Sequence, residues 1–331
     1  MPAVTQWNSH DIVAALYSGI LNRVGSPEDA VRWADELDIQ QVPLDEVIRR
    51  FADSDERMEI ERRRPRSLPA PWVGGPALTI VDVGAQPLDS EDDVHRPLLV
   101  GGGCQVIGFE PLEAGYNARH ARDGGWRLLT DFVGDGSRRT FYETAWGPQS
   151  SLYEPDLAAM GDFDGMAEVS VAGTREVDTV RLDDVINEPV DFLKLDVQGA
   201  ELDVLRGATR ILDSVLAVHV EVEFIPIYLS QPLFDDVFRF MVTNEFDLFD
   251  LPRLERCRYL GGLKRADRVV WAEAVFIPSR RRLGRLDAVQ TMRLARIMRD
   301  AYGALDLCEW LLSRLDGRLG SSYLDQLPAV G

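Results

Sequence analysis

The sequence is short of positive charge. Its 331 residues include 36 Lys and Arg against 55 Asp and Glu, which gives a net charge of −19. A surface built for nucleic acid or for an anionic membrane needs an excess of basic residues. We therefore expect neither partner, and a small neutral molecule fits better.

Cysteine is also scarce. The three cysteines, Cys104, Cys257 and Cys308, lie far apart and form no Cys-x-x-Cys or Cys/His pattern. This spacing indicates neither a disulfide framework nor a zinc site. We expect no bound metal, and a reducing cytoplasm suits such a chain.

Long apolar runs are missing. No window approaches the roughly 20 apolar residues that a membrane helix needs, and no basic stretch followed by an apolar run stands near residue 1. The sequence therefore predicts neither a membrane span nor export.

Lysine is the rarest charged residue, since only Lys194 and Lys264 occur among the 36 basic residues. Arginine stays protonated, so a lysine can be retained where a titratable amine is needed. The alternative is that both lysines remain by chance.

The chain divides into three predicted segments. Residues 1–66 combine apolar residues at helical spacing with a charged linker from Glu56 to Arg66, after which several prolines follow. Residues 67–280 form the main domain. Residues 281–331 return to helical spacing and are predicted to be a helical extension.

The main domain alternates strands and helices. Short apolar, β-branched runs are typical of buried parallel strands, and helical spacing is seen at Ala200 to Leu212 and Leu233 to Thr243. The predicted strands cover residues 78–83, 105–109, 127–133, 191–195, 216–222, 246–251 and 269–277. This alternation indicates a doubly wound α/β sheet.

The first site motif is Ile80-Val-Asp-Val-Gly-Ala85, followed 26 residues after Gly84 by Glu110 at the end of the next strand. A strand ending in glycine lets the backbone approach a ligand, and the following acid can bind ribose hydroxyls. The loop Gly84-Ala-Gln-Pro87 lacks the glycines of a dinucleotide site. A nucleoside without a diphosphate, such as S-adenosylmethionine, fits this pattern.

The second motif is Phe192-Leu-Lys-Leu-Asp-Val-Gln-Gly-Ala-Glu201. Lys194 and Asp196 face the same side of one strand, and Glu201 stands near the start of the next helix. These groups suit either a base or an orienting cation for a hydroxyl. The alternative is a buried ion pair with Glu201 capping the helix.

The third motif is Val218-His-Val-Glu-Val-Glu223, whose alternation places His219, Glu221 and Glu223 on one strand face. The two carboxylates could bind a hydroxyl or a hard cation. His219, among valines, fits a satisfied core residue better than a metal ligand.

Taken in order, these motifs resemble the FkbM family of S-adenosylmethionine-dependent methyltransferases over about residues 78–278. The resemblance rests on the segments 81–85 (Val-Asp-Val-Gly-Ala), 108–111 (Gly-Phe-Glu-Pro), 150–155 (Ser-Ser-Leu-Tyr-Glu-Pro), 177–184, 191–201, 221–228 and 231–234. It implies a seven-stranded, Rossmann-like class I methyltransferase sheet with small helical N-terminal and C-terminal extensions, and methyl transfer to oxygen.

The resemblance also implies roles for residues. The cofactor side would consist of Asp82, Gly84 and Ala85 at the methionine end, Glu110 at the ribose, and Phe132, Val133 and Asp135 around the adenine. On the acceptor side Lys194, Asp196 and Glu201 match the family motif. We expect Lys194 or Glu223 to act as the base or orienting group, and Asp196 to order both the methionine portion and the acceptor.

Two positions depart from the family pattern. Gln86-Pro87 replaces the usual Asn and glycine after Gly84-Ala85, and Gln198 replaces an acid before Gly199. The first leaves the shape of the cofactor loop open, and the second removes one charge from the site.

The predicted function is O-methylation of a hydroxyl on a sugar, glycan or natural product, by a cytoplasmic enzyme that can form homo-oligomers. A non-catalytic scaffold of the same fold in polysaccharide assembly is the alternative. A nicotinamide-dependent oxidoreductase shares the strand, glycine and acid pattern but needs a phosphate loop that this sequence lacks.

Overall fold

The computed structural model describes residues 9, 12–14, 16–17, 25–52, 54, 68–88, 93–167, 169–262, 268–320 and 322–326. The predicted linker from Glu56 to Arg66 and residue Lys264 lie outside these ranges.

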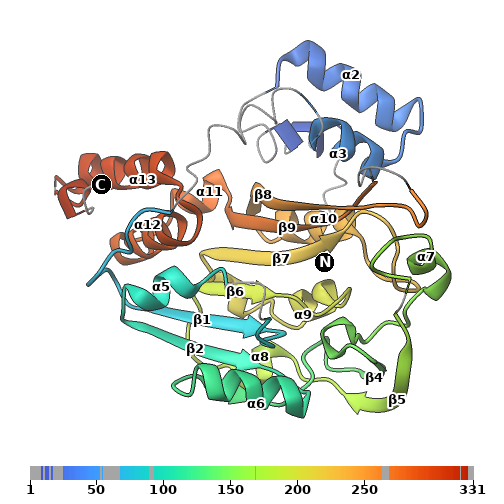
Figure 1. Ribbon diagram of the computed structural model, residues 1–331. Helices are drawn as coiled ribbons and strands as arrows, with labels where there is room; N and C mark the ends of the chain where they lie inside the picture. Colours follow the sequence, from blue (N-terminus) through green and yellow to red (C-terminus); the bar gives the residue numbers. More distant parts are fainter. Residues whose placement is uncertain are drawn as a thin grey trace.

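A seven-stranded sheet forms the centre of the molecule (Figure 1), with the strand order β3-β2-β1-β6-β7-β9-β8. Its strands are β1 (Leu78–Val83), β2 (Cys104–Phe109), β3 (Arg127–Leu129), β6 (Phe192–Leu195), β7 (Ala217–Glu223), β8 (Phe246–Cys257) and β9 (Arg268–Pro278). β9 runs in the direction opposite to the other six strands, because it pairs antiparallel with both β7 and β8. This arrangement confirms the predicted Rossmann-like methyltransferase sheet.

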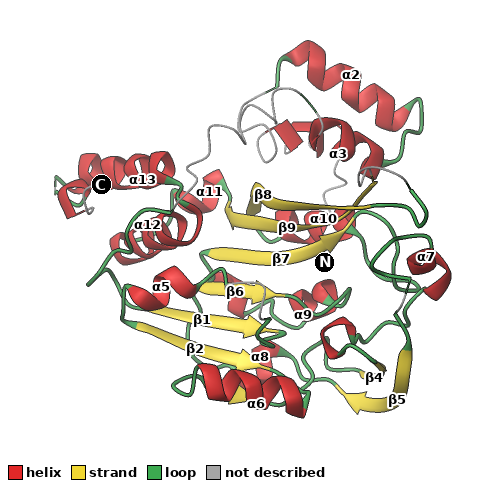
Figure 2. Cartoon of the chain, viewed as in Figure 1, coloured by secondary structure: helices red, strands yellow, loops and turns green. Residues whose placement is uncertain are grey.

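Helices cover both faces of the sheet (Figure 2), as the continuous apolar strands require. One face packs against α8 (Leu182–Val185), α9 (Glu201–Arg206) and α10 (Phe234–Thr243). The opposite face packs against α5 (Arg96–Val100), α12 (Ala288–Tyr302) and α13 (Leu305–Leu319). The site is therefore confined to the ends of the strands.

The N-terminal segment contains α2 (Pro27–Asp38) and α3 (Leu44–Ala52), which lie above β8 in Figure 1. Ser26 caps α2 because its hydroxyl accepts a hydrogen bond from the Asp29 amide at 3.1 Å. Val47 and Phe51 of α3 belong to the same apolar core as the first face of the sheet.

The C-terminal segment consists of α11 (Arg280–Leu283), α12 and α13, and a 3-10 turn, Leu324–Gln326. Gly303, with φ +64°, separates α12 from α13. Among the helices that the structure describes, none combines the length and hydropathy of a membrane span.

Several elements differ from the sequence prediction. β3 ends at Leu129 instead of Val133, and α9 ends at Arg206, followed by a separate 3-10 turn, Ile211–Asp213. A separate two-stranded antiparallel sheet of β4 (Arg138–Thr144) and β5 (Val171–Asp178) is absent from the sequence prediction. The remaining elements are α6 (Glu113–Arg122), α7 (Leu157–Gly161) and the 3-10 turn Gly147–Gln149.

Candidate active site

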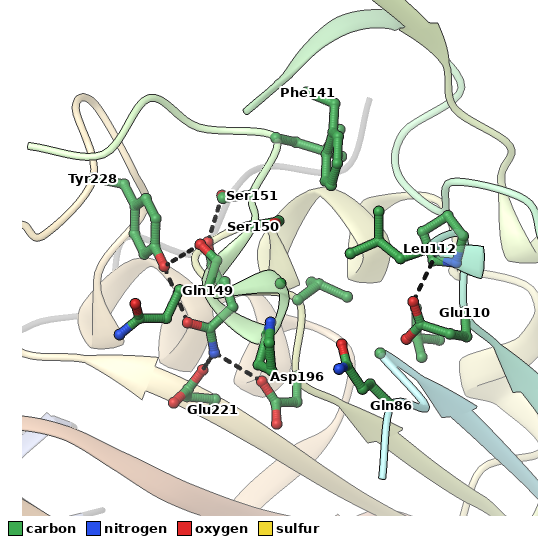
Figure 3. Close-up of a pocket in the computed structure, with 18 of the residues that line it drawn as sticks. Gln86, Glu110, Leu112, Phe141, Gln149, Ser150, Ser151, Asp196, Glu221 and Tyr228 are labelled. Carbon is green, nitrogen blue, oxygen red and sulfur yellow. Dashed lines mark hydrogen bonds between the residues drawn. The ribbon is translucent and has the colours of Figure 1, made fainter. Parts of the chain in front are cut away.

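The four parallel strands β1, β2, β6 and β7 end at one edge of the sheet, where open α/β sheets place their ligands. A cavity of about 260 Å³ opens at this edge. Its walls come from the loops after these strands and from residues 146–152. Figure 3 shows Glu110 on one side of this cavity and Tyr228 on the other, with Gln86 and Asp196 between them.

Six of the predicted site residues line the cavity, and the other five lie behind its wall. The lining residues are Gly84, Glu110, Phe132, Val133, Asp196 and Glu223. Asp82, Ala85, Asp135, Lys194 and Glu201 stand outside the lining.

Glu110 follows β2 and is 3% exposed. Its carboxylate accepts a hydrogen bond from the Leu112 amide at 2.9 Å, and burial raises its pKa to about 7. Gly115 gives it room, because a Cβ there would lie 2.7 Å from the Glu110 carboxyl carbon. Glu110 is thus a fixed, buried hydrogen-bond acceptor at the cavity wall.

Gly84 follows β1 and lies against the backbone of Asp196, which follows β6. Its φ is +79°, and a Cβ would lie 1.8 Å from the Asp196 carbonyl oxygen. Glycine is therefore required, both for the backbone conformation and for the contact. Ala85 is buried beside it, and its carbonyl accepts a hydrogen bond from Arg119 Nε at 2.6 Å.

An apolar slot lies beyond Glu110. Phe132 and Val133 line it together with Phe141, whose ring meets Phe132 edge to face at 4.8 Å. Such a slot suits a flat heterocycle. Asp135 does not reach it, because its carboxylate accepts hydrogen bonds from the Ser137 amide and hydroxyl. Asp135 therefore shapes a turn.

Lys194 lies outside the cavity lining and contacts the loop that follows β1. Its ammonium donates to the Gly84 carbonyl at 3.0 Å and lies 3.2 Å from Asp82 Oδ1 and 3.6 Å from Asp196 Oδ2. Burial lowers its pKa, but the carboxylates of Asp82 and Asp196 outweigh burial and raise the pKa above the ordinary value. These contacts favour the orienting cation over the base among the two roles left open by the sequence.

The Glu201 carboxylate holds the loop between β6 and α9. It is 2% exposed, and its carboxylate accepts from the Val197 amide at 2.8 Å. Burial raises its pKa to about 8. Val197 lies in the loop before α9, and the helix has no side-chain capping bond at its N-cap Ala200, so Glu201 holds this loop and does not cap the helix.

Gln198 bridges two carboxylates. In the sequence it stands out only because the family often has an acid at this position. Its side-chain nitrogen donates to Asp196 Oδ1 at 3.0 Å and to Glu221 Oε2 at 2.7 Å. Its side-chain oxygen accepts from the Tyr228 hydroxyl at 3.0 Å. An acid at this position could not donate both bonds.

The backbone of Gln198 is held as well. It adopts φ +58°, and its carbonyl accepts from the Ser151 hydroxyl at 2.6 Å. Ser151, Gln198 and Tyr228 come from three distant segments, so sequence spacing gives no signal for this network.

Glu221 and Glu223 both line the cavity, as their alternation on β7 predicts. Burial raises the pKa of each well above the ordinary value, and neighbouring acids add to the effect. His219 lies behind them, with Nε2 2.7 Å from Glu273 and Nδ1 3.1 Å from the Tyr302 hydroxyl. It is a satisfied core residue, as expected.

Among the described residues, only Asp82, Asp93 and His95 bring possible metal-ligand atoms within 4.8 Å of one another. Arg119 already pairs with Asp93 at 2.7 Å, and Lys194 with Asp82. None of the three lines the cavity. We therefore assign no metal to this cluster.

The strand order and the cavity at the carboxyl edge define a class I methyltransferase fold. A family model described as the methyltransferase FkbM domain matches residues 82–259, more than half of the chain. The chain therefore belongs to the FkbM methyltransferase family, as its motifs predict. A search of curated proteins gave no significant match.

Solved structures give distant likenesses. Methyltransferase FkbM from Methylobacillus flagellatus is 12% identical with a TM-score of 0.35, and the match covers 80% of this chain and 58% of that one. A TehB-like SAM-dependent methyltransferase from Corynebacterium glutamicum is 11% identical with a TM-score of 0.29, over 66% of this chain and 85% of that one. The chain thus spans less than two thirds of the first relative, and family membership rests on the sequence model.

S-adenosyl-L-methionine is the cofactor of this methyltransferase family, and the residues fit it. The cavity offers an apolar slot, the buried acceptor Glu110 and the close backbone approach at Gly84 in one continuous wall. Gln86 lines the cavity between Glu110 and Asp196 in Figure 3. The departure at Gln86-Pro87 therefore leaves the cavity open.

Proposed function

We propose that this protein is an O-methyltransferase acting on a hydroxyl group of a sugar, a glycan or a natural product. The observation that carries the proposal is Glu223, a buried carboxylate at the end of β7 in the same cavity as Glu110 and Asp196. A hydroxyl is a poor nucleophile until its proton is removed, and a buried carboxylate is a suitable acceptor.

The cofactor, when bound, supplies a methyl group on a positively charged sulfur. In the proposal Glu110 accepts hydrogen bonds from the ribose hydroxyls, and Phe132 with Val133 encloses the adenine. The Gly84 backbone and Asp196 bind the methionine end. Lys194 keeps the Gly84 loop and Asp196 in place through its contacts with both.

Glu223 then takes the proton of the acceptor hydroxyl. Its raised pKa makes it a stronger base than an ordinary carboxylate. Gln198 and Tyr228 fix the neighbouring Asp196 and Glu221, so the acceptor meets a rigid wall. Methyl transfer depends mainly on aligning the acceptor oxygen with the methyl group, and a rigid wall serves this alignment.

Two features support the expected setting. The three cysteines are free thiols within the described residues, which suits a reducing cytoplasm. The cavity is of a size for small molecules or the end of a glycan.

The first experiment is calorimetric titration with S-adenosylhomocysteine, with NADH as the control ligand. We expect micromolar binding by the wild type, a loss of at least tenfold in Glu110→Ala, and no binding of NADH. Absence of S-adenosylhomocysteine binding by the folded wild type would overturn the cofactor assignment.

Turnover is tested with Glu223→Gln, which keeps the shape of the side chain. We expect methyl transfer to fall at least about 100-fold while S-adenosylhomocysteine still binds. Unchanged turnover would remove Glu223 from the mechanism. Binding without any methyl transfer by the wild type across sugar acceptors would favour the scaffold alternative.

A further inference from the structure

The acceptor half of the cavity is acidic. It is lined by Asp196 just after β6, by Glu221 and Glu223 near the end of β7, and by Glu273 in the middle of β9. Glu221 and Glu273 stand directly opposite each other on the antiparallel strands β7 and β9. On the other side of β9, Arg253 of β8 stands directly opposite Glu273 and lies outside the cavity lining.

Basic side chains do not balance this charge from within the cavity. Of the described residues that line it, none is Lys, Arg or His. His219 contacts Glu273 from behind, and Gln198 contacts Glu221 as a neutral donor. Behind the cavity, Lys194 lies 3.6 Å from Asp196 Oδ2. Burial, and then Asp196, raise the pKa of Glu221.

Methyl transfer to a neutral hydroxyl needs one carboxylate as a base. Glu223 fills that role in the proposed function, and Asp196 belongs to the cofactor end. Glu221 and Glu273 remain, and neither is needed for a neutral acceptor. A ligand with a positive charge would favour the charged form of these two carboxyl groups and bind to them.

A metal ion is a poor fit for these two residues. Within the described part of the chain, the cavity acids do not bring three ligand atoms within 4.8 Å of one another, whereas hard cations take six or more oxygen ligands. An ammonium group is satisfied by one or two carboxylates and nearby neutral oxygens.

The wall beside these acids is aromatic. Trp271 stands directly opposite Glu223 across β7 and β9 and lines the cavity with Tyr228. Aromatic faces bind apolar ring surfaces and cations alike. The combination suits a polyhydroxylated ring that carries an amine.

We infer that the acceptor is a cationic amino sugar or a related polyhydroxylated amine, whose ammonium group binds Glu221 and Glu273 while a neighbouring hydroxyl faces Glu223. The inference rests on the proposed function and narrows its substrate class. It also excludes acceptors with carboxylate or phosphate groups in this half of the cavity.

The test uses the full-length protein saturated with S-adenosylhomocysteine, titrated at neutral pH with three probes. These are glucosamine, N-acetylglucosamine, which lacks the charge, and glucuronate, which reverses it. We expect glucosamine to bind at least tenfold more tightly than either of the others. Equal or tighter binding of N-acetylglucosamine or glucuronate, or no binding of glucosamine, would overturn the inference.

The variants Glu273→Gln and Glu221→Gln locate the effect. Each keeps an oxygen that can accept the present hydrogen bond, and each should reduce the preference for glucosamine at least fivefold. The matched control is Glu176→Gln on β5, where Glu176 is exposed and accepts a hydrogen bond from Thr140. It removes the same charge at a residue outside the cavity lining and should leave the preference unchanged.

The two failures are distinguishable. If S-adenosylhomocysteine does not bind, the proposed function fails before any sugar is added. If it binds and the preference for the amine is absent, or survives in both Glu273→Gln and Glu221→Gln, only the inference about the acceptor fails.

Discussion

Lys194 is one of two lysines, and its titratable amine suggested a base. Two carboxylates and a carbonyl now surround it, and a cation so placed holds its proton. The rarity of lysine therefore drew attention to position 194, but it could not show whether the amine acts as a base or as an orienting cation.

Glu110 carries a pH dependence that can be measured. Its pKa of about 7 lies above the ordinary value of 4.5, so between these values the folded protein keeps a proton that the unfolded chain has lost. Stability must therefore fall as the pH rises from 4.5 to 7, by about 3 kcal/mol for this group. Glu110→Gln should lack this part of the fall.

Urea unfolding of the wild type and of Glu110→Gln between pH 4.5 and 8 measures the difference. Gln keeps an oxygen that can accept the Leu112 amide hydrogen bond, so the comparison isolates the charge. Parallel stability curves for the two proteins would show that the carboxyl group of Glu110 titrates normally.

At the scale of secondary structure, burial determined what the sequence could predict. β1, β6 and β7 are buried almost throughout, so their apolar runs were visible as strands. β5 is exposed along nearly its whole length and carries no apolar alternation. Its pairing with β4 arises from the fold and has no signal in the residues.

The same reasoning applies to the site. Glu110, Asp196 and Glu223 were predictable because each stands at or just beyond the end of a recognisable strand. Gln198, Tyr228 and Ser151 were missed because tertiary contacts unite them. Asp135 lies outside the cavity lining and accepts hydrogen bonds from Ser137, and its position in the loop after β3 does not determine where its side chain points.

The junction of β1 with β6 leaves no room for a side chain at Gly84. Gly84→Ala adds a Cβ that would lie 1.8 Å from the Asp196 carbonyl and strains a residue with φ +79°. We expect a loss of about 3 kcal/mol or more in the free energy of unfolding, and loss of S-adenosylhomocysteine binding. Thermal unfolding and calorimetry measure both.

Gly173→Ala on β5 is the matched control, because a Cβ there meets nothing within 4 Å. It should change stability by less than about 1 kcal/mol. A Gly84→Ala protein as stable as Gly173→Ala would show that β1 and β6 do not meet as closely as the structure indicates.

In the whole molecule, the C-terminal helices share the core of the sheet. Leu294 and Ile297 of α12 pack with Ile80 and Phe192 of the sheet. Arg296, fully buried, donates to the carbonyls of residues 75, 76, 98 and 102. The division at residue 280 stays a proposal, and these contacts argue that the segment after it is required for folding.

A chain ending at residue 280 tests this directly. It would expose the apolar strand face that α12 and α13 cover, and leave several buried carbonyls without their donor. We expect it to aggregate and to lack a cooperative unfolding transition. Arg296→Met in the full chain should unfold cooperatively at lower temperature, since it removes the buried charge and its hydrogen bonds and little apolar surface. A 1–280 chain that folds and binds S-adenosylhomocysteine would instead show that the last helices are an appendage to an independent methyltransferase domain.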